Sequence, residues 1–149
     1  MLKIWKYSTT DEYFDLLDFH DAVVEKIQVM ENQIVVEIES INILAGHPLN
    51  PYEVAKNTDK CSLIFVHPIS SEATLFLEDK NLRHIESTDF KELEILKFDR
   101  YKQNDGYLYE IFGSDNTFCE WKVQAKGLIL DWNDYVGDAW FVGWEGVPD

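Results

Sequence analysis

The chain has 149 residues, of which 46% are hydrophobic and 14% aromatic. This content predicts a single folded domain over residues 1–149 and excludes a disordered acidic tail, because the apolar surface can offset the entropy of ordering the backbone. Thirteen Lys and Arg against 28 Asp and Glu give a formal charge of −15, which argues against nucleic-acid and membrane-surface partners.

The N-terminal ten residues include Lys3 and Lys6 but no apolar run of the length that a secretion signal requires. No other stretch of the chain approaches the length of a membrane span. We therefore expect a cytoplasmic protein. The acidic field would attract a basic protein, although a high negative charge also serves solubility alone. The oligomeric state cannot be read from these features.

The first predicted element is a short helix over residues 10–18. Thr9 followed three residues later by Glu12 is the pattern of a capping box, and apolar residues follow at helical spacing. The pair His20–Asp21 comes next, where the helix gives way to the first strong strand. Such a pair could bind a metal or act as an acid–base couple, but the chain adds no helical histidine motif. We favour a turn role and predict no metal or other cofactor.

A β-hairpin is the clearest element of the N-terminal third. Ile27 and Val29 alternate with polar residues before a turn at Glu31–Asn32. The apolar residues after the turn occupy one face of an antiparallel strand: Ile34, Val36 and Ile38. Downstream, the apolar positions become odd-numbered, which predicts a bulge near Glu39–Ser40.

Short strands separated by turns rich in Asn, Asp and Gly fill the rest of the chain. They are predicted at residues 62–66, 73–77, 93–98, 107–112 and 117–130. In the last of these, Cys119 and Trp121 lie on the apolar face of a regular alternation, which places Cys119 in the core. The pattern predicts a mainly β fold, an antiparallel sandwich or partly open barrel with one short N-terminal helix.

Local signatures of catalysis are missing from the sequence. There is no Gly-x-Ser-x-Gly elbow and no glycine-rich phosphate loop. His47 and His67 both precede proline, which indicates loops or strand ends. Without an export signal, Cys61 and Cys119 are expected to be reduced core residues, although their pairing stays open. We therefore predict no catalytic residues and favour a protein that is not an enzyme.

The segment 127–149 is the most distinctive stretch, because it mixes aromatic and acidic residues and contains no Lys or Arg. Aromatic side chains provide contact area, and carboxylates steer basic partners. This composition yields six candidate binding residues: Asp131, Trp132, Asp134, Asp138, Trp140 and Trp144. The alternative, which we favour slightly, is that the aromatic residues close the core while the carboxylates stay in water.

The residues Phe19–Ile27, reading FHDAVVEKI, followed by residues 31–38, resemble the opening His-Asp hairpin of small bacterial β-rich domains. Some of those domains are similar to immunity proteins of polymorphic toxin systems. The resemblance covers about the first third of the chain. It implies a β-rich fold and a protein-binding role, and it carries over no catalytic residues.

Three functions follow in order of preference. The first is a bacterial interaction protein that is not an enzyme, an acidic inhibitor that covers the basic active site of a toxin. The second is a β-sandwich or barrel that binds a small molecule in a pocket lined by aromatic side chains. The third is a metal-assisted hydrolase that acts through His20 and Asp21.

Overall fold

The computed structural model describes residues 4–144. It confirms the mainly β prediction, with 56% of residues in strands and 6% in helices. All strand pairs are antiparallel, and they form one ten-stranded and one four-stranded sheet. Within the described residues, no helix is long and apolar enough to cross a membrane.

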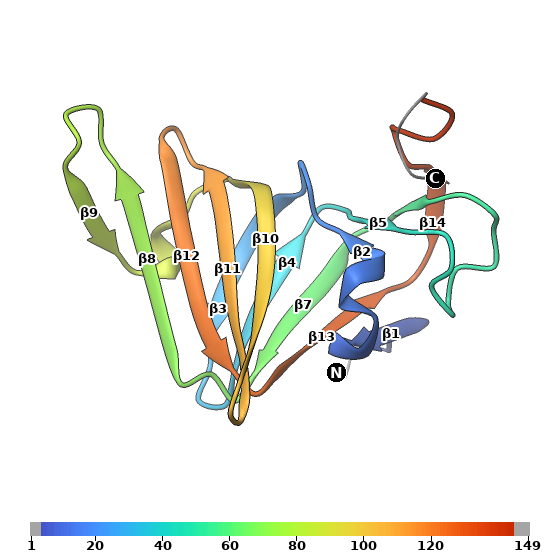
Figure 1. The fold of residues 1–149 in the computed structure, drawn as a ribbon, viewed down its shortest axis with the longest axis horizontal. Helices are drawn as coiled ribbons and strands as arrows, with labels where there is room; N and C mark the ends of the chain where they lie inside the picture. The colour runs from blue at the N-terminus through green and yellow to red at the C-terminus, as the bar shows by residue number, and fades with distance from the viewer. Residues whose placement is uncertain (1–3, 145–149) are drawn as a thin grey trace.

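The larger sheet has the strand order β1-β13-β7-β4-β3-β10-β11-β12-β8-β9, and the smaller has the order β14-β6-β5-β2 (Figure 1). The strands of the larger sheet are β1 (Tyr7–Thr10), β3 (Val23–Val29), β4 (Gln33–Ile38), β7 (Cys61–Val66), β8 (Ser70–Phe76), β9 (Leu82–Ile85), β10 (Leu93–Gln103), β11 (Gly106–Ser114), β12 (Phe118–Ala125) and β13 (Gly127–Trp132). The smaller sheet comprises β2 (Leu17–Asp18), β5 (Asn42–Ile43), β6 (Lys56–Thr58) and β14 (Tyr135–Asp138). Two short 3-10 helices complete the fold: η1 (Asp11–Leu16) and η2 (Ser87–Asp89).

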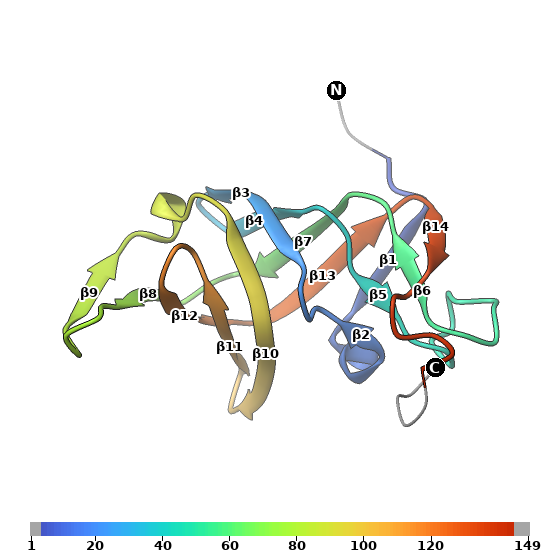
Figure 2. The same cartoon turned by 90° about the horizontal axis from the view of Figure 1, so that it is seen from above.

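The large sheet bends so that β10, β11 and β12 face β4, β7 and β13 (Figures 1 and 2). The core lies inside this bend. Phe65 of β7 stands at its centre, with its ring centroid 5.1 Å from that of Tyr109 and 5.6 Å from that of Trp121. These side chains are fully buried, so the two halves pack like the layers of a sandwich, although the sheet does not close into a barrel.

One corner of the bend lies where β7 leads into β8 and, beside it, β12 leads into β13. Val66 pairs with Gly127 and Ser70 pairs with Gln124, so three residues on one strand lie opposite two on the other. The extra residue lies in the connection from β7 to β8, which turns the corner beside the shorter connection from β12 to β13. His67, the first residue after β7, has a positive φ of 49°, which turns the backbone at this corner. The predicted strand over 117–130 is therefore two strands, β12 and β13, because Lys126 lies at the corner between the layers.

The N-terminal helix differs from its prediction. It is a 3-10 helix limited to Asp11–Leu16, with a kink at Tyr13, and no side chain caps its first residue. Thr9 lies instead in β1, paired with Leu130 of β13, and its hydroxyl contacts His47. Pairing with β13 holds residues 7–10 extended, which leaves too few residues for a regular helix. The predicted capping box therefore does not form.

The bulge predicted near Glu39–Ser40 is also wrong. Strand β4 ends at Ile38, and Ile43 enters the smaller sheet, where it is fully buried. The chain thus changes sheet instead of continuing along one strand. A bulge does occur in the partner strand β3, between Val24 and Lys26.

Asp11 joins the N-terminal segment to three strands of the large sheet. Its carboxylate accepts hydrogen bonds from the Tyr109 hydroxyl at 2.6 Å and from the Leu128 backbone amide at 2.7 Å. The Arg100 guanidinium donates to the Asp11 carbonyl at 2.7 Å and to its carboxylate at 3.3 Å. Because β10, β11 and β13 come from both layers, this one side chain fixes the layers together close to the corner at Lys126.

Replacing this carboxylate should destabilise the protein strongly. Asp11→Ala leaves the largely buried Arg100 and Tyr109 groups without their acceptor, so we expect a loss of about 3 kcal/mol in the free energy of unfolding. Urea denaturation followed by tryptophan fluorescence would measure it. Glu12→Ala, one residue along the same helix, is the matched control and should change stability by less than about 0.5 kcal/mol. Equal losses in the two variants would contradict the assignment.

Candidate functional site

The acidic and aromatic segment that begins at residue 127 has side chains both in the core and at the surface. Trp132, the last residue of β13, is fully buried and stacks on Tyr7 with ring centroids 5.3 Å apart. Asp131, one residue earlier, is also buried, and burial raises the pKa of its carboxyl group above the usual value. These two candidate residues therefore belong to the interior of the protein and do not lie on a binding surface.

Trp140 and Trp144 lie at the surface, with 52% and 60% of their area exposed. Their ring centroids are 5.2 Å apart and their planes are nearly perpendicular, the edge-to-face arrangement that aromatic pairs favour. Phe141, between them in sequence, is buried in a small cluster with Ala55 and Ala139. This anchor holds the two indoles outward in a turn that follows β14.

Two exposed carboxylates lie near the start and end of β14. Asp138 pairs with Lys56 of β6, whose ammonium group also sits 4.4 Å from the ring centroid of Tyr52. The backbone amide of Asp134 donates to the Asp59 carboxylate at 3.1 Å, and Asp134 is exposed. We call Asp134, Asp138, Trp140 and Trp144 the tail surface. It combines aromatic area with negative charge.

His20 and Asp21 form an exposed turn. The His20 Nδ1 atom lies 3.1 Å from the Asp21 carboxylate, and both side chains are about half exposed, at 52% and 50%. The His20 amide donates to Asp18, and the Asp21 amide donates to Ile95 of β10 at 2.7 Å. Asp21 has φ of 67°, a conformation that Asp tolerates better than most residues. These contacts account for the pair as a turn that starts β3.

A metal site needs several converging ligands. Within residues 4–144, no three His, Cys, Asp or Glu side chains come together in a way that could hold a metal ion. The cysteines are free and buried, and burial raises the pKa of Cys61 to about 12 and that of Cys119 to about 11. Both thiols are therefore protonated at neutral pH and poorly nucleophilic.

Searches with this chain against protein-family models, curated proteins and solved structures found no match. Its function must therefore be argued from its own residues.

A second aromatic surface was not predicted from the sequence. Phe112 of β11 and Phe118 of β12 stack on the outer face of the large sheet, with ring centroids 5.5 Å apart, and Phe76 of β8 lies beside Phe112. The sequence does contain a pattern that could have predicted this surface. In a strand that buries Cys119 and Trp121, alternation turns Phe118 outward, so an aromatic residue at that position marks an exposed apolar patch.

His47 is the one buried histidine among the described residues. Its Nδ1 atom accepts a hydrogen bond from the Leu49 amide at 3.0 Å, so the ring proton is on Nε2, which contacts the Thr9 hydroxyl at 3.0 Å. The neutral imidazole thereby links the loop after β5 to strand β1. A second ring proton would remove the acceptor for Leu49.

Stability should therefore fall in mild acid. Burial lowers the pKa of His47 below its usual value of 6.5. Below about pH 6.5, His47 is therefore protonated in the unfolded chain but still neutral in the folded protein. The free energy of unfolding is highest above about pH 6.5 and decreases as the pH drops toward the folded pKa. Urea titrations at pH 7.5 and 5.5 would measure this decrease. It should shrink in His47→Gln and persist in His20→Gln; an unchanged decrease in His47→Gln would rule out the assignment.

The two classes of tryptophan should separate by stability. Trp132→Ala empties a fully buried site, so we expect a loss of about 3–5 kcal/mol. Trp144→Ala removes a side chain that is more than half exposed, and its cost should stay below about 1 kcal/mol. Thermal and urea unfolding of both variants would measure the difference. A large loss in Trp144→Ala would place that residue in the core.

Proposed function

We propose that this protein binds a basic protein through the tail surface and is not an enzyme. The observation that carries the proposal is the exposed pair Trp140 and Trp144, held outward by Phe141 in the turn that follows β14, the strand that begins after Asp134 and ends at Asp138. Large indole rings are costly to leave in water unless a partner covers them. Tryptophan is also among the residues that contribute most to binding energy at protein interfaces.

The charge of the chain supports a basic partner. A formal charge of −15 accelerates the encounter with a positively charged protein and repels an acidic one. Asp134 and Asp138 place part of this charge at the two ends of β14, the strand that leads into the turn of Trp140 and Trp144, where it would orient the partner. Steering by carboxylates and retention by indoles are separate contributions, and they can be measured separately.

The resemblance of the His-Asp hairpin to bacterial domains of immunity type suggests the kind of partner. An inhibitor of a toxin that acts on nucleic acid must cover a basic active site, and an acidic aromatic surface is suited to that task. We place the protein in the cytoplasm, in keeping with its two free cysteines.

The alternatives have less support. A ligand inside the bent sheet would compete with Phe65, Tyr109 and Trp121, which fill that space. A hydrolase using His20 and Asp21 would need ligands or bases beyond this exposed turn.

The test is capture from the source cell at low salt, with identification of the bound protein and kinetics on the purified pair. We expect a basic partner whose dissociation rate rises at least tenfold in Trp144→Ala, because an indole is lost from the interface. Asp134→Asn should mainly lower the association rate, and salt should do the same. Asp134 suits this purpose better than Asp138, whose ion pair with Lys56 would also be lost.

Phe118→Ala is the matched control, because this residue is equally exposed but lies on the outer face of the large sheet. It should leave both rates unchanged. The proposal is wrong if the wild-type chain retains no basic protein, or if the partner binds the Trp140→Ala, Trp144→Ala double variant as tightly as the wild type.

A further inference from the structure

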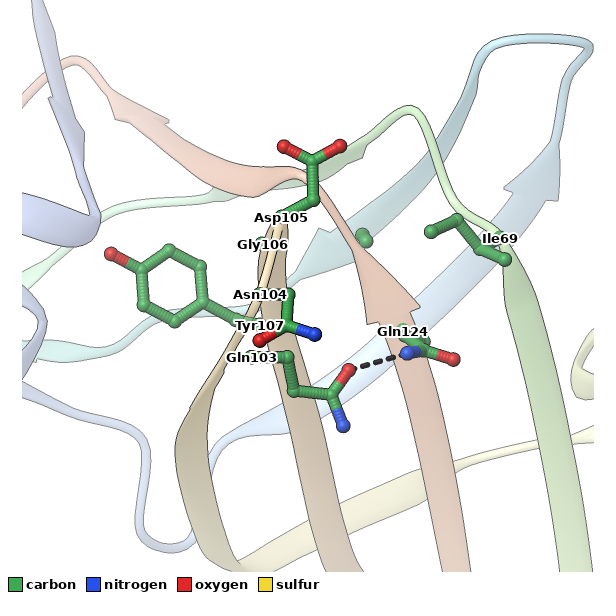
Figure 3. Close-up of a pocket in the computed structure, with 8 residues that line it drawn as sticks. Ile69, Gln103, Asn104, Asp105, Gly106, Tyr107 and Gln124 are labelled. Atoms are coloured by element: carbon green, nitrogen blue, oxygen red, sulfur yellow. Dashed lines mark hydrogen bonds between the residues drawn. The ribbon is translucent and has the colours of Figure 1, made fainter.

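A hollow of about 460 Å³ lies between the tip of the β10–β11 hairpin and the corner where β7 turns into β8. Figure 3 shows the hairpin side formed by Gln103 and Asn104 and the opposite side formed by Gln124 and Ile69. The volume lies within the range of small-molecule sites in proteins. The tail surface contributes no residue to it.

The walls of this hollow are held in place. The Gln124 side-chain amide donates a hydrogen bond to the Gln103 carbonyl oxygen across the strands, and its own oxygen lies 3.4 Å from the Ser70 hydroxyl. Gly106 carries the hairpin tip close to β12, where a Cβ atom would lie only 2.3 Å from the Ala125 carbonyl oxygen. A side chain at this position would therefore push the hairpin away from β12 and change the shape of the hollow.

The lining offers neutral hydrogen-bonding groups. Three carboxamides face or border the space, and each combines two N–H donors with a carbonyl acceptor: Gln103, Asn104 and Gln124. Within residues 4–144, the Gln103 side-chain amino group and the Asn104 side-chain amide take part in no hydrogen bond, so both are available to a ligand. Asp105 adds an acceptor, and Ile69, which is 72% exposed, adds an apolar surface.

The same groups exclude other ligand classes. Among the described residues, no Lys, Arg or His lines the hollow, and Asp105 together with the −15 charge of the chain repels anions such as phosphates. One carboxylate is too few for a Ca²⁺ ion, which takes six to eight oxygen ligands. The Tyr107 ring points away from the space, toward Arg100 and Lys102, so a nucleobase finds no ring to stack on (Figure 3).

We infer that this hollow binds a neutral, polyhydroxylated small molecule, a sugar or sugar-like polyol. Each sugar hydroxyl both donates and accepts a hydrogen bond, which matches the paired donor and acceptor of a carboxamide. Asp105 accepts from two neighbouring hydroxyls, and the C–H face of the ring packs on Ile69. The inference is independent of the tail surface and of the proposed protein partner.

The test is a titration of the whole ¹⁵N-labelled chain with glucose, galactose, mannose and N-acetylglucosamine, followed by amide chemical shifts. We expect saturable shifts at residues 103–107, 69 and 124 for at least one of these sugars. Asn104→Ala should weaken that binding at least tenfold. Asn81→Ala, which removes an exposed turn amide outside the hollow, should leave it unchanged.

Charge provides a second arm of the experiment. Glucuronate, the carboxylate counterpart of glucose, should bind at least tenfold more weakly than the neutral sugar, and Asp105→Asn should reduce that difference. The inference is overturned if no neutral sugar gives saturable shifts at these amides up to 100 mM. Binding that is equal in wild type and Asn104→Ala would overturn it as well.

Discussion

The fold depends on one carboxylate that reaches both layers of a sheet that does not close. Asp11 accepts hydrogen bonds from Tyr109 and Leu128 and binds Arg100, so β10 and β11 of one layer are joined to β13 of the other. Arg100 is itself packed between the rings of Phe14 and Tyr107.

The surfaces that could bind partners lie on different parts of the molecule. The tail surface follows β14 on the side of the smaller sheet, whereas Phe112 and Phe118 lie on the outer face of β11 and β12, toward the opposite end (Figure 1). The hollow at the β10–β11 hairpin has no residue in common with either. A partner held by Trp140 and Trp144 would therefore leave the hairpin hollow open to a small ligand.

Several predictions from the sequence hold because they rest on local periodicity. The hairpin around Glu31–Asn32 and the alternation that buries Cys119 and Trp121 are both confirmed, since one face of each strand packs on the core wherever the strand goes. The predictions that fail concern neighbours distant in sequence. Thr9 pairs with Leu130 of β13, and this pairing prevents the capping box that residues 9–12 would otherwise favour.

For the candidate site, the sequence determined composition and charge: an acidic segment, residues 127–149, with five aromatic residues and no Lys or Arg. It could not divide that segment between core and surface, because Trp132 and Trp140 are both tryptophans within two positions of an Asp. Only the tertiary structure decided that Trp132 faces the layer interior while Trp140 and Trp144 face water. The physical reason is that burial depends on which strands lie opposite, and those strands are chosen by pairing across the bend, not by the residues next in the chain.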